Sequence, residues 1–358
     1  MAKLFEPLTL RGLTIRNRAW TSPMCQYSSR DGMPNDWHLV HLGSFAKGGA
    51  GLVMTEATAV VPQGRITPAC AGIWSDEQGE AYARTVSFIR SQGAAAGMQL
   101  AHAGRKGSSQ IPWRGHGSVP VDQGGWQTQA PSALQFGDYA LPTAMTTAEI
   151  DALVEAWGAG ARRALEAGFD VVEVHAAHGY LLHEFLSPLS NRREDEYGGP
   201  LANRARLLLR VVEQVRAVWP QDRPLFVRVS ATDWVAGGWT LDECVVVSRW
   251  LGELGVDLID VSSGGLDPSQ QIPIGPGYQV PLASRVRNKA GIPTSAVGLI
   301  LDGAHAEQVL HEGAADAVMV ARAMLRDPAW AQHAALDLGA APPWPQQYHR
   351  VVELPKTV

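Results

Sequence analysis

The stretch EAGFDVVEVHAAH, residues 166–178, contains the unit from which the fold is built. A helix-like segment ends at Gly168, and glycine is the usual residue just past a helix end. The apolar, β-branched run that follows predicts a strand covered on both faces. Two other boundaries, in ELGVD and HEGAAD, have the same form. The strand ends in His175 and His178, so the stretch also marks a candidate site.

This unit recurs along the chain. The predicted strands are 19–24, 51–57, 97–104, 171–178, 225–231, 258–265, 292–298 and 316–322. The predicted helices are 36–48, 76–93, 147–168, 201–218, 240–255, 280–290, 302–312 and 324–338. Eight strand-then-helix units predict an α/β protein, a single (β/α)8 TIM barrel. The alternative is a doubly wound sheet, which usually carries a glycine-rich phosphate loop, and the sequence has neither GxGxxG nor GxxxxGK[ST].

Three segments lie outside the repeat. LTLRGLTIRNR, residues 8–18, predicts an N-terminal β-hairpin. Residues of about 105–145 follow the third strand and are rich in Gly, Pro, Ser, Gln and Trp, which predicts a long insertion over the active site. The proline-rich residues of about 339–358 form a C-terminal tail. We expect residues 1–358 to be one domain.

Composition narrows the class of protein. The net charge of −5 gives no basic footprint for nucleic acid. The three cysteines are widely spaced and form no CxxC, which argues against a disulfide framework and favours a reducing compartment. No signal peptide and no apolar run of about 20 residues is present. We therefore expect a cytoplasmic protein with no membrane or nucleic-acid partner.

In a barrel, polar residues at the carboxyl ends of the strands are the catalytic candidates. They are Cys25, Tyr27, Glu56, Gln99, His102, His175, His178, Tyr180, Arg228, Ser262, Ser263, Gly298 and Arg322. Carboxylates are scarce in this set, whereas a hydrolase or a divalent-metal site would normally show more of them.

His175 and His178 allow three interpretations. They could be two ligands of a zinc ion, although His102 and Cys25 are the only further strand-end ligands available. They could be two histidines that bond to the backbone of a loop. They could also donate hydrogen bonds to a carbonyl oxygen or oxyanion, with Tyr180 as a general acid.

Gln99 and Arg228 favour a flat heterocyclic ligand, because an amide both donates and accepts and Arg228 needs an electron-rich partner in its apolar strand. An internal salt bridge from Arg228 to Glu56 or Glu173 is the alternative. Gly298 and Arg322 end the last two strands, where such barrels usually bind phosphate. A heterocycle with a phosphate and no metal ion suggests FMN.

The chain resembles the Old Yellow Enzyme family of FMN-dependent ene-reductases along nearly its whole length. The most specific match is HAAHGYLLHEFLSPLSNRREDEYGG at 175–199. The stretches SPMCQYSS (22–29), EATAVVPQGRITP (56–68), GIWSDEQ (72–78) and QLAHAGRK (99–106) resemble the subclass of xenobiotic and "thermophilic-like" reductases. That subclass has a cysteine at the position of Cys25.

The resemblance implies how FMN would be held. Pro23, Met24, Cys25, Ala57 and Gln99 would lie beside its ring system, and Arg228 would face its N1/O2 edge. The phosphate chain would lie along Ser263, Gly298, Ala321 and Arg322. The family often has Gly-Arg where this chain has Ala321-Arg322. NADPH or NADH would be the reductant.

The resemblance also implies a reaction, the reduction of the activated C=C bond of an α,β-unsaturated carbonyl compound. His175 and His178 would hold the carbonyl oxygen, hydride would go from flavin N5 to the β-carbon, and Tyr180 would protonate the α-carbon. Tyr27 and Cys25 would contact the substrate, although Cys25 could instead be a small apolar filler. Arg350 matches a position that often reaches a neighbouring subunit, so we expect a homo-oligomer, a dimer or tetramer.

Two other classes compete with this interpretation. A metal-dependent aldolase or hydrolase barrel would use His175 and His178 as ligands. A flavin-binding barrel without catalysis would bind FMN but would not couple it to an alkene.

Overall fold

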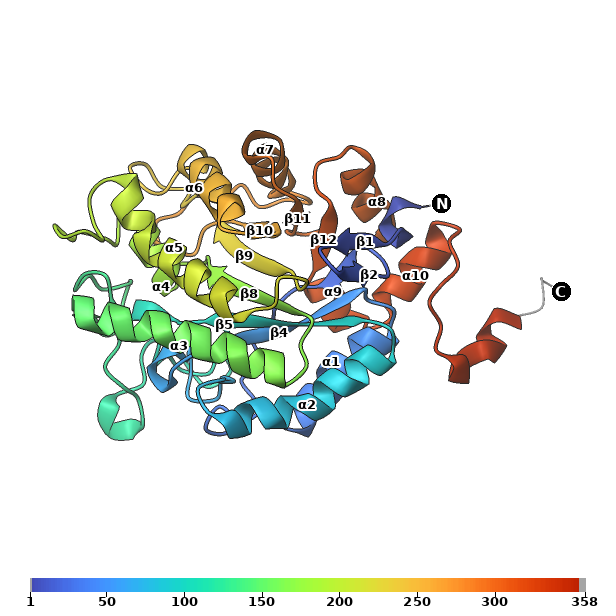
Figure 1. Cartoon of the computed structure of the whole chain (residues 1–358), viewed down its shortest axis with the longest axis horizontal. Coiled ribbons are helices and arrows are strands. Elements are labelled where there is room, and N and C mark those ends of the chain that lie inside the picture. The colour runs from blue at the N-terminus through green and yellow to red at the C-terminus, as the bar shows by residue number, and fades with distance from the viewer. Residues whose placement is uncertain (1, 354–358) are drawn as a thin grey trace.

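A closed barrel of parallel strands forms the centre of the molecule (Figure 1). The computed structural model describes residues 2–353. The strands follow the chain around the barrel, and β12 pairs with β3 to close it. They are β3 Ala19–Thr21, β4 Leu52–Ala59, β5 Ala95–Ala101, β8 Val171–Ala176, β9 Leu225–Ser230, β10 Leu258–Ser262, β11 Thr294–Ala296 and β12 Ala317–Val320. Each coincides with a predicted strand, so the predicted (β/α)8 barrel is confirmed.

Helices cover the outside of the barrel (Figure 1). They are α1 Asp36–Lys47, α2 Asp76–Ser91, α3 Thr147–Glu166, α5 Leu201–Val218, α6 Leu241–Glu253, α7 Val280–Ala290 and α8 Gly303–His311. Ser75, Thr146 and Thr240 begin three of them with capping boxes, in which the side chain of the cap and that of the third helical residue bond to each other's backbone.

Two differences from the predicted helices have local causes. The predicted helix 324–338 is divided into α9 Arg322–Arg326 and α10 Trp330–Asp337. Asp327 is extended, with φ −138° and ψ 92°, because a residue before proline avoids the helical conformation. The short helix α4 Leu181–Leu186 was not predicted. All six of its residues are buried, including His183 and Glu184, so it lacks the alternation of apolar and solvent-exposed positions that would mark a helix in the sequence.

The N-terminal end of the barrel is filled and covered. The predicted hairpin is present as β1 Leu8–Leu10 and β2 Leu13–Ile15, which pair antiparallel. Leu10 and Ile15 join a buried cluster with Trp20 and Phe226, whose rings stack at 5.8 Å, and with the first residues of several strands. This end therefore contributes stability, and the carboxyl ends of the strands remain for a site.

Residues between β5 and α3 form the insertion. They contain the short 3-10 helices η3 Gly104–Lys106 and η4 Val121–Gln123, and a parallel strand pair, β6 Gln129–Ala130 and β7 Thr143–Ala144. Backbone bonds from Ala103 N to Gly64 O (2.8 Å) and from Ser109 N to Ile66 O (2.8 Å) fasten its start to the loop after β4. The insertion is therefore held beside the carboxyl end of the barrel.

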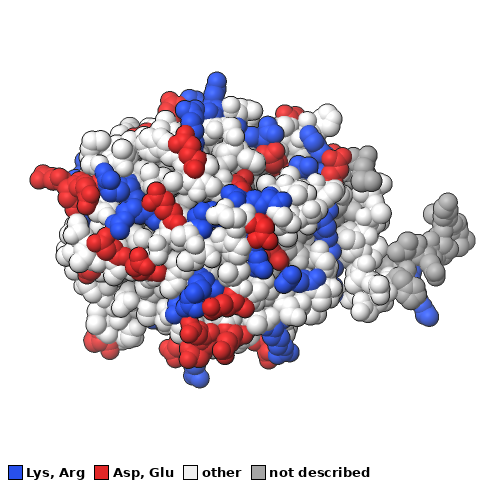
Figure 2. Space-filling model, in the orientation of Figure 1, with Lys and Arg blue, Asp and Glu red and all other residues white. Residues whose placement is uncertain are grey.

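The surface carries charges of both signs. Figure 2 shows Lys and Arg side chains interspersed with Asp and Glu over one face, and ion pairs such as Arg162–Glu166 and Arg210–Asp151 join neighbouring charges. Within residues 2–353, none of the helices is long and apolar enough to cross a membrane.

The chain after α10 leaves the barrel and ends in the 3-10 segment η5 Gln346–Glu353, which projects from the body in Figure 1. Lys47 on α1 donates to the Tyr348 hydroxyl at 3.2 Å, and Arg350 is exposed.

Candidate active site

Strand register brings the polar strand ends together. Gln99 on β5 lies opposite Glu173 on β8, and His175 on β8 lies opposite Arg228 on β9. Arg228 in turn lies opposite Asp260 on β10. Four neighbouring strands therefore carry one continuous polar row near the carboxyl end of the barrel.

Arg228 makes a buried ion pair, but not with the predicted carboxylates. Its Nε lies 3.1 Å from Oδ2 of Asp260, and its Nη1 donates to Ser22 Oγ at 3.1 Å. The sequence analysis named Glu56 or Glu173 as alternative partners. Asp260 takes this place because it occupies the same register position on the adjacent strand, where both side chains face the barrel interior.

Gln99 and Glu173 form the second polar contact of this row. Gln99 Nε2 donates to Glu173 Oε1 at 2.7 Å, and both side chains are buried. Burial and repulsion from Asp260 raise the pKa of Glu173, whereas Arg228 and Gln99 oppose the shift. The charge of Arg228 therefore lies beside two buried carboxylates, Asp260 and Glu173, and it cannot neutralise both, which favours the protonated form of Glu173.

The end of β8 and the sharp turn that follows it present the three candidate catalytic residues. His178 has φ +59° and Gly179 has φ +68°, both in the left-handed region. A Cβ at Gly179 would lie 2.1 Å from the carbonyl oxygen of Gly265, so glycine is required there. The ring of His175 lies 5.2 Å from that of His178 and 5.3 Å from that of Tyr180. The turn thus gathers the predicted group into one cluster.

The environment fixes the protonation of this cluster. Burial, reinforced by the charge of Arg228, lowers the pKa of both His175 and His178 well below the usual value. Burial also raises the pKa of the Tyr180 phenol well above its usual value. At neutral pH the site therefore holds two neutral imidazoles and a protonated phenol.

The two histidines have different partners. His178 Nε2 lies 2.7 Å from Ser262 Oγ at the end of β10. His175 Nδ1 is buried and has no hydrogen-bond partner within the described chain. An unpartnered buried ring nitrogen is costly unless a ligand satisfies it.

Lys106, in η3, is a site residue that the sequence analysis did not single out. Its Nζ donates to the carbonyl oxygens of His178 (2.7 Å) and Gly265 (2.8 Å). It also lies 4.9 Å from the centre of the Tyr180 ring. Burial lowers the pKa of Lys106 to about 8. Its position just after a strand-end motif was the only signal in the sequence.

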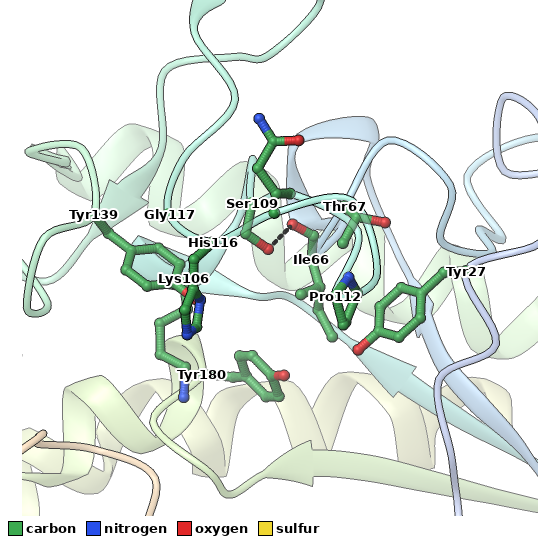
Figure 3. Close-up of a pocket in the computed structure, with 12 residues that line it drawn as sticks. Tyr27, Ile66, Thr67, Lys106, Ser109, Pro112, His116, Gly117, Tyr139 and Tyr180 are labelled. Carbon is green, nitrogen blue, oxygen red and sulfur yellow. Dashed lines mark hydrogen bonds between the residues drawn. The ribbon is translucent and has the colours of Figure 1, made fainter.

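A cavity of about 620 Å³ opens above this turn (Figure 3). Its walls come from the turn, the loop after β3, the loop after β4 and the insertion. The lining residues are Tyr27, Ile66, Thr67, Lys106, Ser109, Gln110, Pro112, Gly115, His116, Gly117, Tyr139 and Tyr180. Figure 3 shows Tyr27 and Tyr180 on the same cavity, so the structure brings these two predicted residues together.

The loop after β3 carries Cys25 and Tyr27. Glu56, within β4, accepts a hydrogen bond from Gln26 N at 3.1 Å and lies 3.1 Å from His38 Nε2, so it anchors this loop. Tyr27 has φ +51° and its ring meets Trp113 of the insertion edge-on at 5.8 Å.

The residues that the resemblance predicts to contact the flavin ring lie on β4 and β5 and just after β3. Pro23 and Met24 follow β3 and are half-buried, and Ala57 on β4 lies opposite Gln99 on β5. Burial raises the pKa of the Cys25 thiol well above its usual value, which keeps it protonated.

A second, smaller cavity of about 160 Å³ lies at the ends of β11 and β12. Gly298, Ala321 and Arg322 line it together with Ser262 and Gln279. Ser263 lies beside it and donates to Gln279 Oε1 at 2.6 Å. Gln279 was not predicted, because it precedes α7 rather than following a strand.

Within residues 2–353, no group of three or more His, Cys, Asp or Glu side chains is arranged to hold a metal ion. Arg350, on η5, has no described contact with these cavities.

Known proteins with similar sequences identify the family. Residues 3–339 match the NADH:flavin oxidoreductase / NADH oxidase family. The chain belongs to this family. An NADPH dehydrogenase of Geobacillus thermodenitrificans is 49% identical over 350 residues, 97% of this chain and 98% of that protein. An NADPH dehydrogenase of Bacillus subtilis is 46% identical over 351 residues, with the same coverage.

Solved structures of this family have the same fold. Morphinone reductase in complex with tetrahydroNAD superposes with a TM-score of 0.76 and 29% identity, covering 95% of this chain and 91% of that one. An Old Yellow Enzyme homologue from Zymomonas mobilis gives 0.76 and 28%, covering 99% and 94%. The predicted Old Yellow Enzyme type and the predicted class, an FMN-dependent oxidoreductase that uses a nicotinamide, are confirmed.

The residues of the flavin oxidoreductase site fit FMN. Arg322 lines the smaller cavity and has no carboxylate partner within residues 2–353, so its charge is available to a phosphate. Gly298 has φ +118°, and a Cβ there would lie 2.8 Å from Gln279 Nε2, so only glycine leaves this cradle open. The buried Nδ1 of His175, which has no partner within residues 2–353, is a further polar atom that a ligand at the strand ends could satisfy.

Proposed function

We propose that the protein is an FMN-dependent NAD(P)H:alkene oxidoreductase, an ene-reductase that acts on α,β-unsaturated carbonyl compounds. One observation carries the proposal: two neutral imidazoles and a protonated phenol lie together at the end of β8 and in the turn that follows it, beside a cavity of about 620 Å³. Hydrogen-bond donors for a carbonyl and an adjacent acid are the groups that this reaction needs.

When bound, FMN would supply the redox chemistry of hydride transfer from the nicotinamide to the β-carbon of the alkene. His175 and His178 hold the carbonyl oxygen of the substrate. Because His178 is neutral, it has one N–H. His178 Nε2 lies 2.7 Å from Ser262 Oγ, and in the tautomer in which Nε2 accepts from this hydroxyl the proton lies on Nδ1 and is available to the substrate.

Tyr180 delivers a proton from its phenol oxygen to the α-carbon. Its raised pKa keeps the proton in place until the substrate becomes a strong enough base. The ammonium of Lys106, 4.9 Å from the ring, stabilises the negative charge left on the phenol after transfer.

The chain's own residues hold the cofactor from both ends. Arg228 and Gln99 face the ring system, with Pro23, Met24, Cys25 and Ala57 beside it. Ser263, Gly298, Ala321 and Arg322 hold the phosphate chain. The supporting observation is that these residues lie in or just after seven of the eight strands of one barrel, toward their carboxyl ends.

Tyr27 and Cys25 contact the substrate from the loop after β3. The reductant is NADPH, the nicotinamide named for the relatives of 46–49% identity. We further propose a cytoplasmic homo-oligomer, a dimer or tetramer, in which the exposed Arg350 reaches a neighbouring active site.

The visible spectrum of the purified protein tests this proposal. Under anaerobic conditions, NADPH should bleach the flavin band and 2-cyclohexenone should restore it. Bleaching without recovery would leave a flavin-binding protein that does not reduce alkenes. A colourless protein that cannot be loaded with FMN, but loses activity with a chelator, would return His175 and His178 to the role of metal ligands.

A further inference from the structure

The turn that carries His178 and Tyr180 is held by side chains rather than by regular secondary structure. The N–H of His178 donates to Ser230 Oγ at 2.8 Å. The N–H of Gly179 donates to His183 Nδ1 at 2.9 Å. The left-handed conformation is strained at His178, though not at Gly179, and persists there only because the surroundings fix it. Lys106 Nζ also donates to the carbonyl oxygen of His178, and Tyr180 N donates to Ala177 O at 3.2 Å, but the bonds from His178 N and Gly179 N are the ones in which a side chain accepts from the two left-handed residues.

His183 can accept from Gly179 in only one tautomer. If Nδ1 accepts, Nε2 carries the proton, and Nε2 lies 2.8 Å from Oδ1 of Asp233. Both side chains are fully buried. An anion at Nε2 is what selects this tautomer, since a donor there would move the proton to Nδ1 and remove the acceptor.

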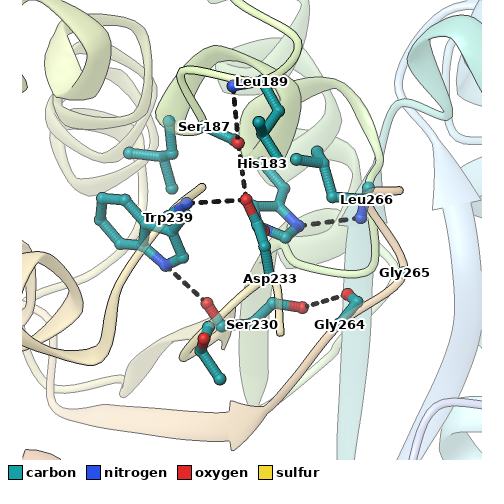
Figure 4. A network of polar contacts seen from close by, with 12 residues as sticks. His183, Ser187, Leu189, Ser230, Asp233, Trp239, Gly264, Gly265 and Leu266 are labelled. Atoms are coloured by element: carbon teal, nitrogen blue, oxygen red, sulfur yellow. Dashed lines mark hydrogen bonds and ion pairs between the residues drawn. The ribbon is translucent and has the colours of Figure 1, made fainter. Parts of the chain in front are cut away.

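Asp233 is itself held in place (Figure 4). Its Oδ2 accepts from Ser187 Oγ at 2.6 Å and from the N–H of Trp239 at 2.7 Å. Burial acts to raise the pKa of Asp233, but its contacts with His183, Ser187 and Trp239 outweigh this and leave the pKa below its usual value. The carboxylate therefore stays ionised at neutral pH.

The same network reaches the other bond of the turn. The indole Nε1 of Trp239 donates to the carbonyl oxygen of Ser230 at 2.7 Å. The hydroxyl of Ser230 donates to Gly264 O at 2.8 Å, which leaves its lone pairs to accept from His178 N. Figure 4 shows Asp233 between His183 and Trp239, so one carboxylate supports both anchors.

We propose that His183 and Asp233 are positioning residues, which hold the turn through the Gly179 N–H so that His178 and Tyr180 face the substrate. This inference rests on the proposed function, because it concerns the turn that binds and protonates the alkene. Neither residue lines the larger cavity, so they act through the turn and not on the substrate.

Two substitutions of His183 distinguish the loss of the hydrogen-bond acceptor for Gly179 from the loss of the buried contact with Asp233. In His183→Asn, the amide oxygen stands near the place of Nδ1 and can still accept from Gly179, whatever the state of Asp233. In His183→Gln, the amide reaches the place of Nε2 and faces Asp233, but the acceptor for Gly179 is lost. Asp316→Asn is the control, since Asp316 also accepts from a backbone N–H and pairs with an arginine, away from the turn.

The FMN-loaded enzyme is assayed for kcat, KM and the solvent deuterium isotope effect with 2-cyclohexenone, and for hydrogen exchange at the Gly179 amide. For His183→Gln we expect a loss of kcat on the order of 10²-fold, as for a catalytic group misplaced by about 1 Å. We also expect a larger solvent isotope effect, because proton transfer becomes slower, and faster exchange at Gly179. His183→Asn should keep a kcat on the order of tenfold above that of His183→Gln.

Asp233→Asn should resemble His183→Gln, because the loss of the anion changes the tautomer of His183. In the His183→Asn background the same change should have little effect on kcat. Equal kcat and equal Gly179 exchange in the two His183 variants would overturn the inference. Effects of the His183 variants that match those of Asp316→Asn in all readouts would also overturn it.

Other outcomes also decide the question. If the His183 variants do not fold, Ser187→Ala removes one bond to Asp233 and should still speed exchange at Gly179; unchanged exchange overturns the inference. If the wild-type enzyme binds FMN but does not reduce the alkene, the proposed function fails, and the exchange of Gly179 decides the positioning role alone.

Discussion

Replacing Tyr180 by phenylalanine tests the assignment of the proton donor. The change removes one hydroxyl and keeps the ring that packs 5.3 Å from His175 and 4.9 Å from Lys106. The phenol is only half-buried, so we expect little loss of folding stability. A positioned general acid is worth about 10²–10⁴-fold in rate, or about 2.7–5.4 kcal/mol at 1.36 kcal/mol per tenfold.

The assay is anaerobic stopped-flow absorption of the flavin in each half-reaction. Reoxidation by 2-cyclohexenone should slow by about 10²–10⁴-fold, whereas reduction by NADPH, which needs no proton from Tyr180, should stay within about tenfold. Tyr139→Phe makes the same chemical change on the same cavity and serves as the control. Reoxidation of Tyr180→Phe at a rate close to that of the wild type would refute the assignment.

Three further predictions concern the cofactor site and the buried charges. In a fluorescence titration, Gly298→Ala should weaken FMN binding by about 1–3 kcal/mol, because φ is +118° and the added methyl group meets the wall of the cradle. Gly275→Ala is the control, because a methyl group added there meets open space. In urea titrations at pH 7, Arg228→Met should lower the free energy of unfolding by about 3–5 kcal/mol, since Asp260 is left as a buried, unpaired charge. The loss should become smaller as the pH falls, because Asp260 is then protonated. His175 and His178 have folded pKa values below their unfolded value of about 6.5, so the unfolded chain binds more protons in acid, and each should lower stability below about pH 6.5 by up to about 1.4 kcal/mol per pH unit. Because the raised pKa values of Glu173 and Glu184 contribute the opposite slope, the test is the difference in stability between the wild type and the double variant His175→Asn/His178→Asn, and a difference that stays flat from pH 7 to 5 would contradict neutral burial of the histidines.

Local pattern was sufficient for much of the fold. Strands buried on both faces leave continuous apolar runs, and helices leave capping residues such as Ser75 and Thr146, so both could be predicted from neighbouring residues. Helix α4 left no such trace, because it has no solvent face. The division between α9 and α10 could have been predicted from Asp327-Pro328, a boundary signal that the helical pattern around it obscured.

Candidate site residues could be predicted for a similar reason. In a barrel of parallel strands every carboxyl end lies on one face, so the residues that end the strands meet without any knowledge of which strands are neighbours. The sequence therefore determined the set that includes Gln99, His175, His178, Tyr180 and Arg228.

Only the tertiary structure decided how these residues are paired. Strand register gave Arg228 the partner Asp260 rather than Glu56 or Glu173, and closure of the barrel brought Ser22 to it from 206 residues away. The insertion placed Lys106 against the turn. Such contacts depend on the relative positions of distant backbone segments, whereas sequence periodicity reports only whether a residue is buried and on which face. The sequence alone thus determined which groups reach the site, and folding decided their partners and, through burial and charge, their protonation.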